Sequence, residues 1–493
     1  MKTRCASALG VVLCLLLASP VAAAPTSPPD TAGGRRVRAL LAAFEAGTPD
    51  ALRAFVSANF AASALEEVPL EQRVRRLGNM AQQAGPLEFD RIVRESGTEV
   101  AFLARSRKSG DWVEIGVRIE PGSPGGILGL LFQPSDGPGA VHETKKGSDA
   151  EVAAAAHELL RSRAAAGQFS GVALIAHDGK PFFHEAVGLA DRSFSVPNRT
   201  ETRFNVGSIG KAFTQVAIAQ LAAQGRLAFT DTIRKHLPSS VYPSPAADRI
   251  TIQQLVTMMS GLGDVFGEKY DATPKDRLRT LADYLPLFAG EPLLFEPGAD
   301  RRYSNAGYVV LGLIVERISG ESYYDYVRDH VFEPAGMTDT GDWPQDTVVP
   351  NRAVGYTRER GGSGESEAAA SGGTERPNLY ALPARSSSAG GAYSTALDLL
   401  RFDQALRGDR LLSREYGDWF FSGKANRPAT SVRAAASGPA RAGGFGIAGG
   451  TAGANAVLET DLDTGYTIVV LGNLDPPSAE SLGRALRELL GLK

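Results

Sequence analysis

Residues 204–214 read FNVGSIGKAFT and place Ser208 three positions before Lys211. A serine hydroxyl is a weak nucleophile at neutral pH and needs a neighbouring base. Side chains three apart on a helix share one face, with β-carbons about 5–6 Å apart, so the lysine amine can reach the hydroxyl. A lysine near the positive end of a helix can also be partly deprotonated. The stretch therefore predicts a nucleophile and its base at the start of an apolar helix that ends at Gly225.

A second polar triplet, Tyr303-Ser304-Asn305, follows Ser208 by 95 residues (303 − 208). Tyr303 is a further acid/base group, and the Asn305 amide can hold either the lysine or a substrate. Ser208 is the only serine with lysine three residues on, and Tyr303 is the only tyrosine with asparagine two residues on. Together these residues indicate an acyl-transfer site. Taken alone, Ser208 is equally consistent with a capping residue at the start of a solvated helix.

From about residue 151 to residue 493, the chain resembles the family of serine β-lactamases, penicillin-binding D-alanyl-D-alanine carboxypeptidases and related esterases, especially its class C-like branch. The resemblance rests on the two motifs above and on the order and spacing of others. These are Gly188-Leu189-Ala190-Asp191, Leu255-Val256-Thr257 with Ser260-Gly261-Leu262, Phe295-Glu296-Pro297-Gly298, Gly336-Met337-Thr338-Asp339-Thr340 and Gly390-Gly391-Ala392-Tyr393-Ser394-Thr395.

The resemblance implies a serine hydrolase and assigns its site. The expected catalytic residues are Ser208, Lys211 and Tyr303, and the expected substrate contacts are Asn305, Gly449 and Gly450. The backbone N–H groups of Ser208 and Gly450 would form an oxyanion hole.

One motif departs from the family pattern. The family places Lys-Thr-Gly or His-x-Gly on an inner strand that faces the nucleophile, whereas residues 446–453 read GIAGGTAG and put Ile447 at the histidine or lysine position. Isoleucine neither donates a hydrogen bond nor carries charge. Two functions stay open: a hydrolase of esters or amides that forms an acyl-enzyme on Ser208, or a catalytically impaired, ligand-binding member. For the hydrolase we expect a preference for small neutral esters over penicillins, because the polar contact to a carboxylate is lost.

The expected fold class is α+β, with one antiparallel sheet built from both ends of the 151–493 domain and helices on its faces. The elements expected are a helix at 151–166, a hairpin of 172–176 and 181–186, a mostly helical subdomain at 213–385, a hairpin of 454–459 and 466–472, and a closing helix at 479–490. Because the helical subdomain carries Tyr303, the site should lie between subdomains.

A separate small α+β domain is expected at 35–135. Apolar residues recur at helical spacing in its first half, and four strand-like runs with intervening turns follow. Helices followed by strands suggest a cone-shaped, NTF2-like fold. Residues 136–150 read as a linker.

The N-terminus has the pattern of a secretory signal. Residues 1–23 carry Lys2 and Arg4, then a short apolar run, then a small-residue cleavage site ending at Ala23. Both cysteines, Cys5 and Cys14, fall inside this peptide, so a processed chain would contain none. We therefore expect a secreted or periplasmic protein with a flexible leader at 24–34 and no membrane span after cleavage.

Composition excludes several function classes. The formal net charge is −3, so no basic surface indicates a nucleic-acid partner. The histidines lack metal-ligand spacing, and we expect no metal, no cofactor and a small ester or amide as substrate. Asp231 and Asp264 are expected to be turn or capping residues. The segments 358–376 and 423–444 are read as surface loops or lids, and the oligomeric state stays open.

Overall fold

The computed structural model describes residues 27–67, 69–108, 112–120, 122, 126–135, 137, 147–358, 374–421 and 444–492. The chain divides into two compact units, Met1–Gly139 and Ala140–Lys493. The expected signal peptide (1–23), most of the linker (136–150) and nearly all of the two loop segments (358–376 and 423–444) lie outside the described residues. Among the helices that are described, none is both long and apolar enough to cross a bilayer.

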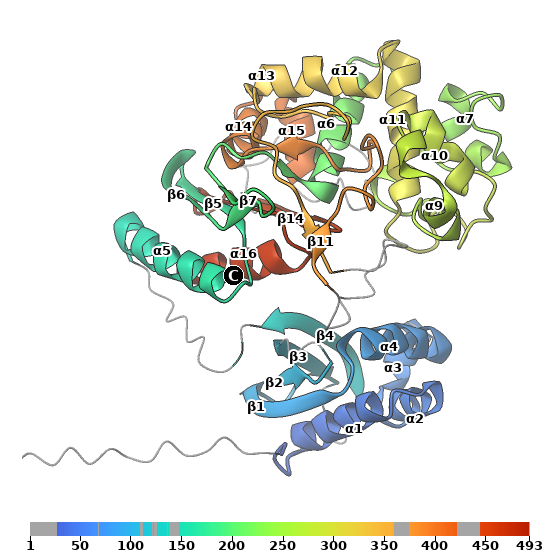
Figure 1. The fold of residues 1–493 in the computed structure, drawn as a ribbon. Helices are drawn as coiled ribbons and strands as arrows, with labels where there is room; N and C mark the ends of the chain where they lie inside the picture. Colours follow the sequence, from blue (N-terminus) through green and yellow to red (C-terminus); the bar gives the residue numbers. More distant parts are fainter. Residues whose placement is uncertain are drawn as a thin grey trace, which may run out of the picture. The chain divides into compact units, whose positions relative to one another are not determined.

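The N-terminal unit consists of helices followed by a sheet (Figure 1). Its helices are α1 (Ala32–Ala46), α2 (Pro49–Asn59), α3 (Ala62–Glu67) and α4 (Leu70–Ala84), and its strands are β1 (Leu87–Glu95), β2 (Glu99–Ser106), β3 (Trp112–Ile119) and β4 (Ile127–Ser135). The strands pair antiparallel in chain order. Buried residues at helical spacing, such as Val37, Leu40 and Phe44, share one core with alternate residues of β2.

Helix α1 begins at Ala32, inside the segment expected to be a flexible leader (24–34). The reason is a cap: the Thr31 hydroxyl accepts a hydrogen bond from the Gly34 N–H at 2.9 Å. Hydrophobic periodicity alone indicated Val37 as the first buried position, and it carried no information about the preceding cap. The helix therefore starts three residues before the expected domain boundary at 35.

The larger unit is organised around a five-stranded antiparallel sheet in the order β13-β14-β15-β5-β6 (Figure 1). Its strands are β5 (Gly171–His177), β6 (Lys180–Val187), β13 (Gly444–Thr451), β14 (Ala454–Asp461) and β15 (Tyr466–Gly472). Strands from both ends of the unit meet where β15 pairs with β5, for example Val469 opposite Leu174. This arrangement confirms the expected α+β class.

Both faces of this sheet are covered. On β5, Val172, Leu174 and Ala176 join the larger core, while Ala173 and Ile175 join a smaller one. Helices α5 (Asp149–Ala165) and α16 (Ser478–Leu489) supply the smaller core. The larger core is built mainly from side chains of the helices that lie between β6 and β13 in the sequence.

That helical part carries the two helices that matter for function, α6 (Gly210–Ala223) and α11 (Asn305–Ser319), which pack against each other. Almost every α6 residue is buried, lysine included. The remaining helices of this part are α7 (Ile233–His236), α8 (Ile252–Val256), α9 (Glu268–Ala272), α10 (Leu281–Phe288), α12 (Tyr323–Val327), α13 (Glu333–Ala335), α14 (Ala396–Arg407) and α15 (Arg414–Phe421). Short strands and 3₁₀ turns complete it, among them β9 (Phe204–Asn205), β12 (Tyr393–Ser394) and the turn η1 (Gly207–Ile209).

Candidate active site

Ser208 lies in the turn η1, between β9 and α6. β9 pairs with β12, Asn205 opposite Tyr393, which anchors the entry to the turn. Gly207 has φ = +49°, a left-handed conformation that side chains rarely adopt. A β-carbon at Gly207 would also lie 2.7 Å from the Gly450 backbone nitrogen. The nucleophile is thus held in a sharp turn against strand β13.

The structure brings the predicted serine, lysine and tyrosine together. The Ser208 hydroxyl lies 2.5 Å from the Tyr303 hydroxyl and 3.1 Å from the Lys211 Nζ. Helix α6 places Lys211 one turn after the serine, as its spacing predicts. Tyr303 reaches the same hydroxyl from just before α11, whose N-cap is Ser304. Ser208 therefore has a potential proton acceptor and a potential proton donor within contact.

Lys211 is buried, and burial lowers its pKa to about 7, while the charge of Asp264 acts in the opposite direction. Its Nζ donates hydrogen bonds to the Asn305 Oδ1 at 2.6 Å and to the Ala389 carbonyl at 2.5 Å. A neutral amine has two N–H bonds and one lone pair. Since two carbonyl oxygens occupy the N–H bonds, the lone pair is left for the Ser208 proton. The lysine is therefore arranged as a base near neutral pH.

Tyr303 has the opposite character. Partial removal of its hydroxyl from water raises its pKa to about 12, although half of the residue's surface is exposed, so the phenol keeps its proton at neutral pH. Its ring centroid lies 4.7 Å from the Lys211 Nζ, a geometry that favours the ammonium form once the lysine has accepted a proton. Tyr303 is thus suited to donate a proton rather than to accept one.

Asn305 is held from its other side by Asp264, a contact that the sequence analysis did not predict. The Asn305 Nδ2 donates to both Asp264 carboxylate oxygens at 3.0 Å, and the Asn305 backbone N–H donates to Oδ2 at 3.4 Å. Asp264 also accepts a hydrogen bond from the Phe266 N–H at 3.2 Å, which is the turn role expected for it. Nothing in the sequence distinguished this aspartate from Asp231, because its partner is 41 residues away.

Gly449 and Gly450 lie beside the nucleophile, on β13. A β-carbon at Gly449 would lie 2.0 Å from the Val206 carbonyl oxygen and 2.8 Å from the Ser208 nitrogen. From another segment, a β-carbon at Gly390 would lie 2.4 Å from the Gly207 carbonyl oxygen. Three backbone segments therefore meet at the serine so closely that only glycine fits. The Gly450 backbone nitrogen therefore lies close to the turn that carries Ser208.

Ile447 does not line the cavity over Ser208. It lies two residues before Gly449, on the same face of β13, and packs partly buried against the larger core. Phe445, on that face too, packs edge-on against Phe420 and Phe421 of α15, with ring centroids 5.3 and 5.5 Å apart. The sequence predicts that isoleucine at this position removes a polar substrate contact that the family has. In the structure its side chain packs against apolar residues of the larger core and offers no polar group.

A cavity of about 530 Å³ opens over Ser208, Tyr303 and Asn305. Much of its wall is aromatic or aliphatic: Val265, Phe266, Tyr270, Tyr284, Tyr380 and Leu382. Lys275, Asp271 and Arg376 add charge to it. Lys275 is held by the Thr273 carbonyl at 2.9 Å and lies 4.0 Å from the Tyr270 ring centroid. The site can therefore take a small ligand with an apolar part and a polar end.

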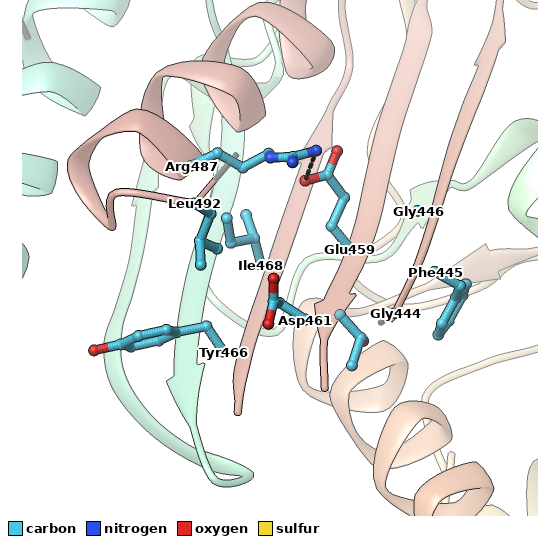
Figure 2. A pocket seen from close by; sticks show the side chains of 10 residues that line it. Gly444, Phe445, Gly446, Glu459, Asp461, Tyr466, Ile468, Arg487 and Leu492 are labelled. Atoms are coloured by element: carbon cyan, nitrogen blue, oxygen red, sulfur yellow. Dashed lines mark ion pairs between the residues drawn. The ribbon is translucent and has the colours of Figure 1, made fainter. Parts of the chain in front are cut away.

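A second hollow, of about 320 Å³, lies on the opposite face of the sheet (Figure 2). Its walls come from β13, β14, β15 and the end of α16, and an ion pair of 3.3 Å joins Arg487 to Glu459. Burial raises the pKa of the Glu459 carboxyl, and Arg487 opposes this rise. None of the residues predicted to act in catalysis lines this hollow.

The described residues contain no group of three or more histidine, cysteine, aspartate or glutamate side chains that could hold a metal ion. Several histidines instead face single carboxylates. Examples are His236 with Asp231 at 2.9 Å and His157 with Glu185 at 2.8 Å. The geometry over Ser208 is that of a nucleophile with its own proton donor and acceptor.

Comparisons with known proteins point to one family and one fold for the larger unit. Residues 156–492 match the Beta-lactamase family model. A penicillin-binding protein from Bacillus halodurans is 30% identical in sequence, with a TM-score of 0.58, and its structure covers 68% of this chain and 98% of its own. A D-stereospecific amidohydrolase from Streptomyces sp. shares the fold at 22% identity, with a TM-score of 0.54 and coverage of 69% and 99%.

Penicillin-binding protein 4* of Bacillus subtilis (strain 168) is 31% identical over 262 residues. That alignment covers 52% of this chain and 56% of the relative, so this chain spans little more than half the length of the curated protein it matches. The N-terminal unit lies before the matched family region, which starts at residue 156.

The close approach at Gly449 leads to a first prediction. Gly449→Ala should reduce the rate of acylation of Ser208 at least about tenfold, because the added methyl must displace β13 or the turn that carries the nucleophile. Gly446→Ala is the matched control on the same strand, where the nearest atom is the flexible Glu459 Cγ at 3.3 Å. Labelling rates with a fluorophosphonate probe measure both. Equal rates for the two variants would contradict the assigned position of the oxyanion hole.

Proposed function

This chain belongs to the beta-lactamase family of serine hydrolases, and we propose that it cleaves ester or amide bonds through an acyl-enzyme formed on Ser208. The proposal rests mainly on one observation: the Ser208 hydroxyl contacts an amine that can accept a proton at neutral pH and a phenol that keeps its proton. The buried Lys211 amine has a pKa of about 7, and the Tyr303 phenol has a pKa of about 12. A base and an acid matched in this way support acyl transfer at neutral pH.

In the proposed acylation, the Ser208 oxygen attacks the substrate carbonyl carbon while the Lys211 Nζ takes the hydroxyl proton. The carbonyl π electrons move onto its oxygen, which the backbone N–H groups of Ser208 and Gly450 stabilise. When the tetrahedral intermediate collapses, the bond to the leaving alcohol or amine breaks and that group takes a proton from Tyr303. The proton held on Lys211 then replaces the one that Tyr303 gave up.

Deacylation repeats these steps with water. A water molecule replaces the leaving group, gives one proton to the same base and attacks the ester carbonyl, and the Ser208 oxygen leaves with a proton returned by Lys211 or Tyr303. The products are a carboxylic acid and the free enzyme. No step requires a cofactor.

The alternative is a ligand-binding member with impaired catalysis. Ile447, which stands where the family has histidine or lysine, is the observation that favours it. Against it stands the intact set of Ser208, Lys211, Tyr303 and Asn305, in hydrogen-bonding contact. That the acyl donor is an ester or amide is also part of the proposal. It is supported by relatives named as penicillin-binding proteins and by an amidohydrolase that shares the fold.

The N-terminal features remain proposals of the same kind. We propose that the small α+β domain has an NTF2-like fold and that residues 1–23 are removed during export to the periplasm or the medium. Removal of residues 1–23 predicts an N-terminus at Ala24, which the intact mass of the exported chain measures. Exported material that begins at Met1 would contradict it.

The nucleophile assignment gives the central test. Ser208→Ala should abolish labelling by a fluorophosphonate probe and turnover of an activated ester, and Lys211→Ala should lower both by at least about a thousandfold because the two residues act as a unit. Intact-mass measurement locates the adduct. A wild-type protein that binds the probe reversibly, without a covalent adduct, would instead support the ligand-binding alternative.

Substrate preference tests the change at position 447. We expect the wild type to hydrolyse a short neutral ester faster than a penicillin, because Ile447 offers a substrate carboxylate no hydrogen bond. Ile447→His, two residues from Gly449 on the same face of β13, should raise the penicillin-to-ester ratio at least about tenfold, since one hydrogen bond to a charged group contributes roughly 1.5–3 kcal/mol. Ile447→Leu, which keeps the apolar packing, is the control and should leave the ratio unchanged. A wild type that prefers penicillin would indicate that another cavity residue, Lys275 or Arg376, supplies the carboxylate contact.

A further inference from the structure

Asp264 is joined to the nucleophile by a continuous chain of polar contacts. Its carboxylate accepts hydrogen bonds from the Asn305 Nδ2 at 3.0 Å, the Asn305 Oδ1 accepts from the Lys211 Nζ at 2.6 Å, and Nζ lies 3.1 Å from the Ser208 hydroxyl. The Ser304 hydroxyl donates a hydrogen bond of 2.7 Å to the Gly263 carbonyl, in the loop that carries Asp264. The start of α11 is therefore tied to this loop at two points.

The carboxylate determines which way the Asn305 amide faces. An ionised carboxylate only accepts hydrogen bonds, so the amide must turn its NH₂ group toward Asp264 and its oxygen toward Lys211. In the reverse orientation, the NH₂ group would face the lysine and donate to the lone pair of its neutral amine. That lone pair is the one that must take the Ser208 proton. The orientation of one buried amide thus decides whether the base is available.

Asp264 also acts on Lys211 by charge. Ser208, in the turn η1 before the lysine's own helix, presents its hydroxyl. Tyr303, just before α11, and Tyr308, within it, present their rings, and the 386–390 segment presents the Ala389 carbonyl. Both tyrosines have raised pKa values and are neutral at neutral pH. Among the described residues, Asp264 is thus the charged group that acts on Lys211, and it opposes the effect of burial on the lysine.

We propose that Asp264 is a positioning residue of the acylation reaction, which orients the Asn305 amide and sets the balance between the protonated and free forms of Lys211. The inference rests on the proposed function, since it assigns a role within the same reaction. It adds to the turn role that the sequence suggested, which the hydrogen bond from the Phe266 N–H fulfils. Asp264 does not touch the reacting atoms and acts through Asn305 and Lys211.

Asp264→Asn separates the charge from the hydrogen bond. Asparagine can still accept a hydrogen bond from Asn305 through its amide oxygen, but its charge is gone. Loss of the negative charge favours the neutral lysine, so the rise of the labelling rate with pH should move to lower pH, by about half a unit or more. The ratio of variant to wild-type rate should therefore be higher at pH 6 than at pH 8.5. Asp264→Ala removes both functions and should lower the rate at every pH by at least about tenfold.

The measurement is the second-order rate constant for labelling of Ser208 by a fluorophosphonate probe, from pH 5.5 to 9. Asp231→Asn is the control: Asp231 is a buried aspartate that accepts hydrogen bonds from the Ala228 N–H at 2.8 Å and from the Lys235 Nζ at 2.6 Å. It should change the melting temperature without moving the pH profile. Asp264→Glu, which keeps the charge, should keep the wild-type profile and serves if the alanine variant fails to fold.

The outcomes are distinct. If the Asp264→Asn profile superimposes on that of the wild type, even at a lower rate, the residue has only a structural role and the inference is overturned. If Asp231→Asn moves the profile equally, the effect is one of general charge, and the inference is overturned as well. A wild type that is not labelled at any pH overturns the proposed function itself, whereas an active wild type with an unmoved variant overturns only the role of Asp264.

Discussion

The structure of the larger unit depends on one buried amine. Lys211 in the unfolded chain would keep its proton up to about pH 10.4, but in the folded protein burial lowers its pKa to about 7. Folding at neutral pH therefore has an energetic cost at this residue, and hydrogen bonds to Asn305 and Ala389 offset part of it. Those acceptors come from α11 and from the 386–390 segment, so burial of this lysine couples α6 to both of them.

Close backbone approach is the second constraint. The turn that carries Ser208 is bordered by Gly449 on β13 and by Gly390, and a β-carbon at either position would overlap backbone atoms. Glycine at these positions allows the sheet and the helical part to meet at the serine. The position of Ser208 and that of the proposed oxyanion hole therefore depend on the same backbone contact, and a substitution at one of these glycines is expected to disturb both.

The site also shows where this chain differs from the pattern it resembles. Lys211 and Tyr303, the groups proposed to move protons, are both present, and the pKa of the lysine is lowered while that of the tyrosine is raised. The change at Ile447 lies on a strand face that packs against apolar side chains, next to the aromatic contacts of Phe445. Lys275, Asp271 and Arg376 of the cavity wall carry charge, whereas β13 contributes no charged side chain.

Local patterns in the sequence determined a large part of this description. The spacing of Ser208 and Lys211 implied a shared helix face, and the apolar runs at 172–176 and 466–472, each beside turn residues, implied hairpin strands, since both are short-range consequences of the backbone. Only the tertiary structure decided the long-range contacts: Asp264 with Asn305, and the packing of Ile447 on the core. A polar residue in a loop looks the same in sequence whether it caps a turn or orients an amide 41 residues away. Which partner it meets depends on how the whole chain packs, and no local periodicity encodes that.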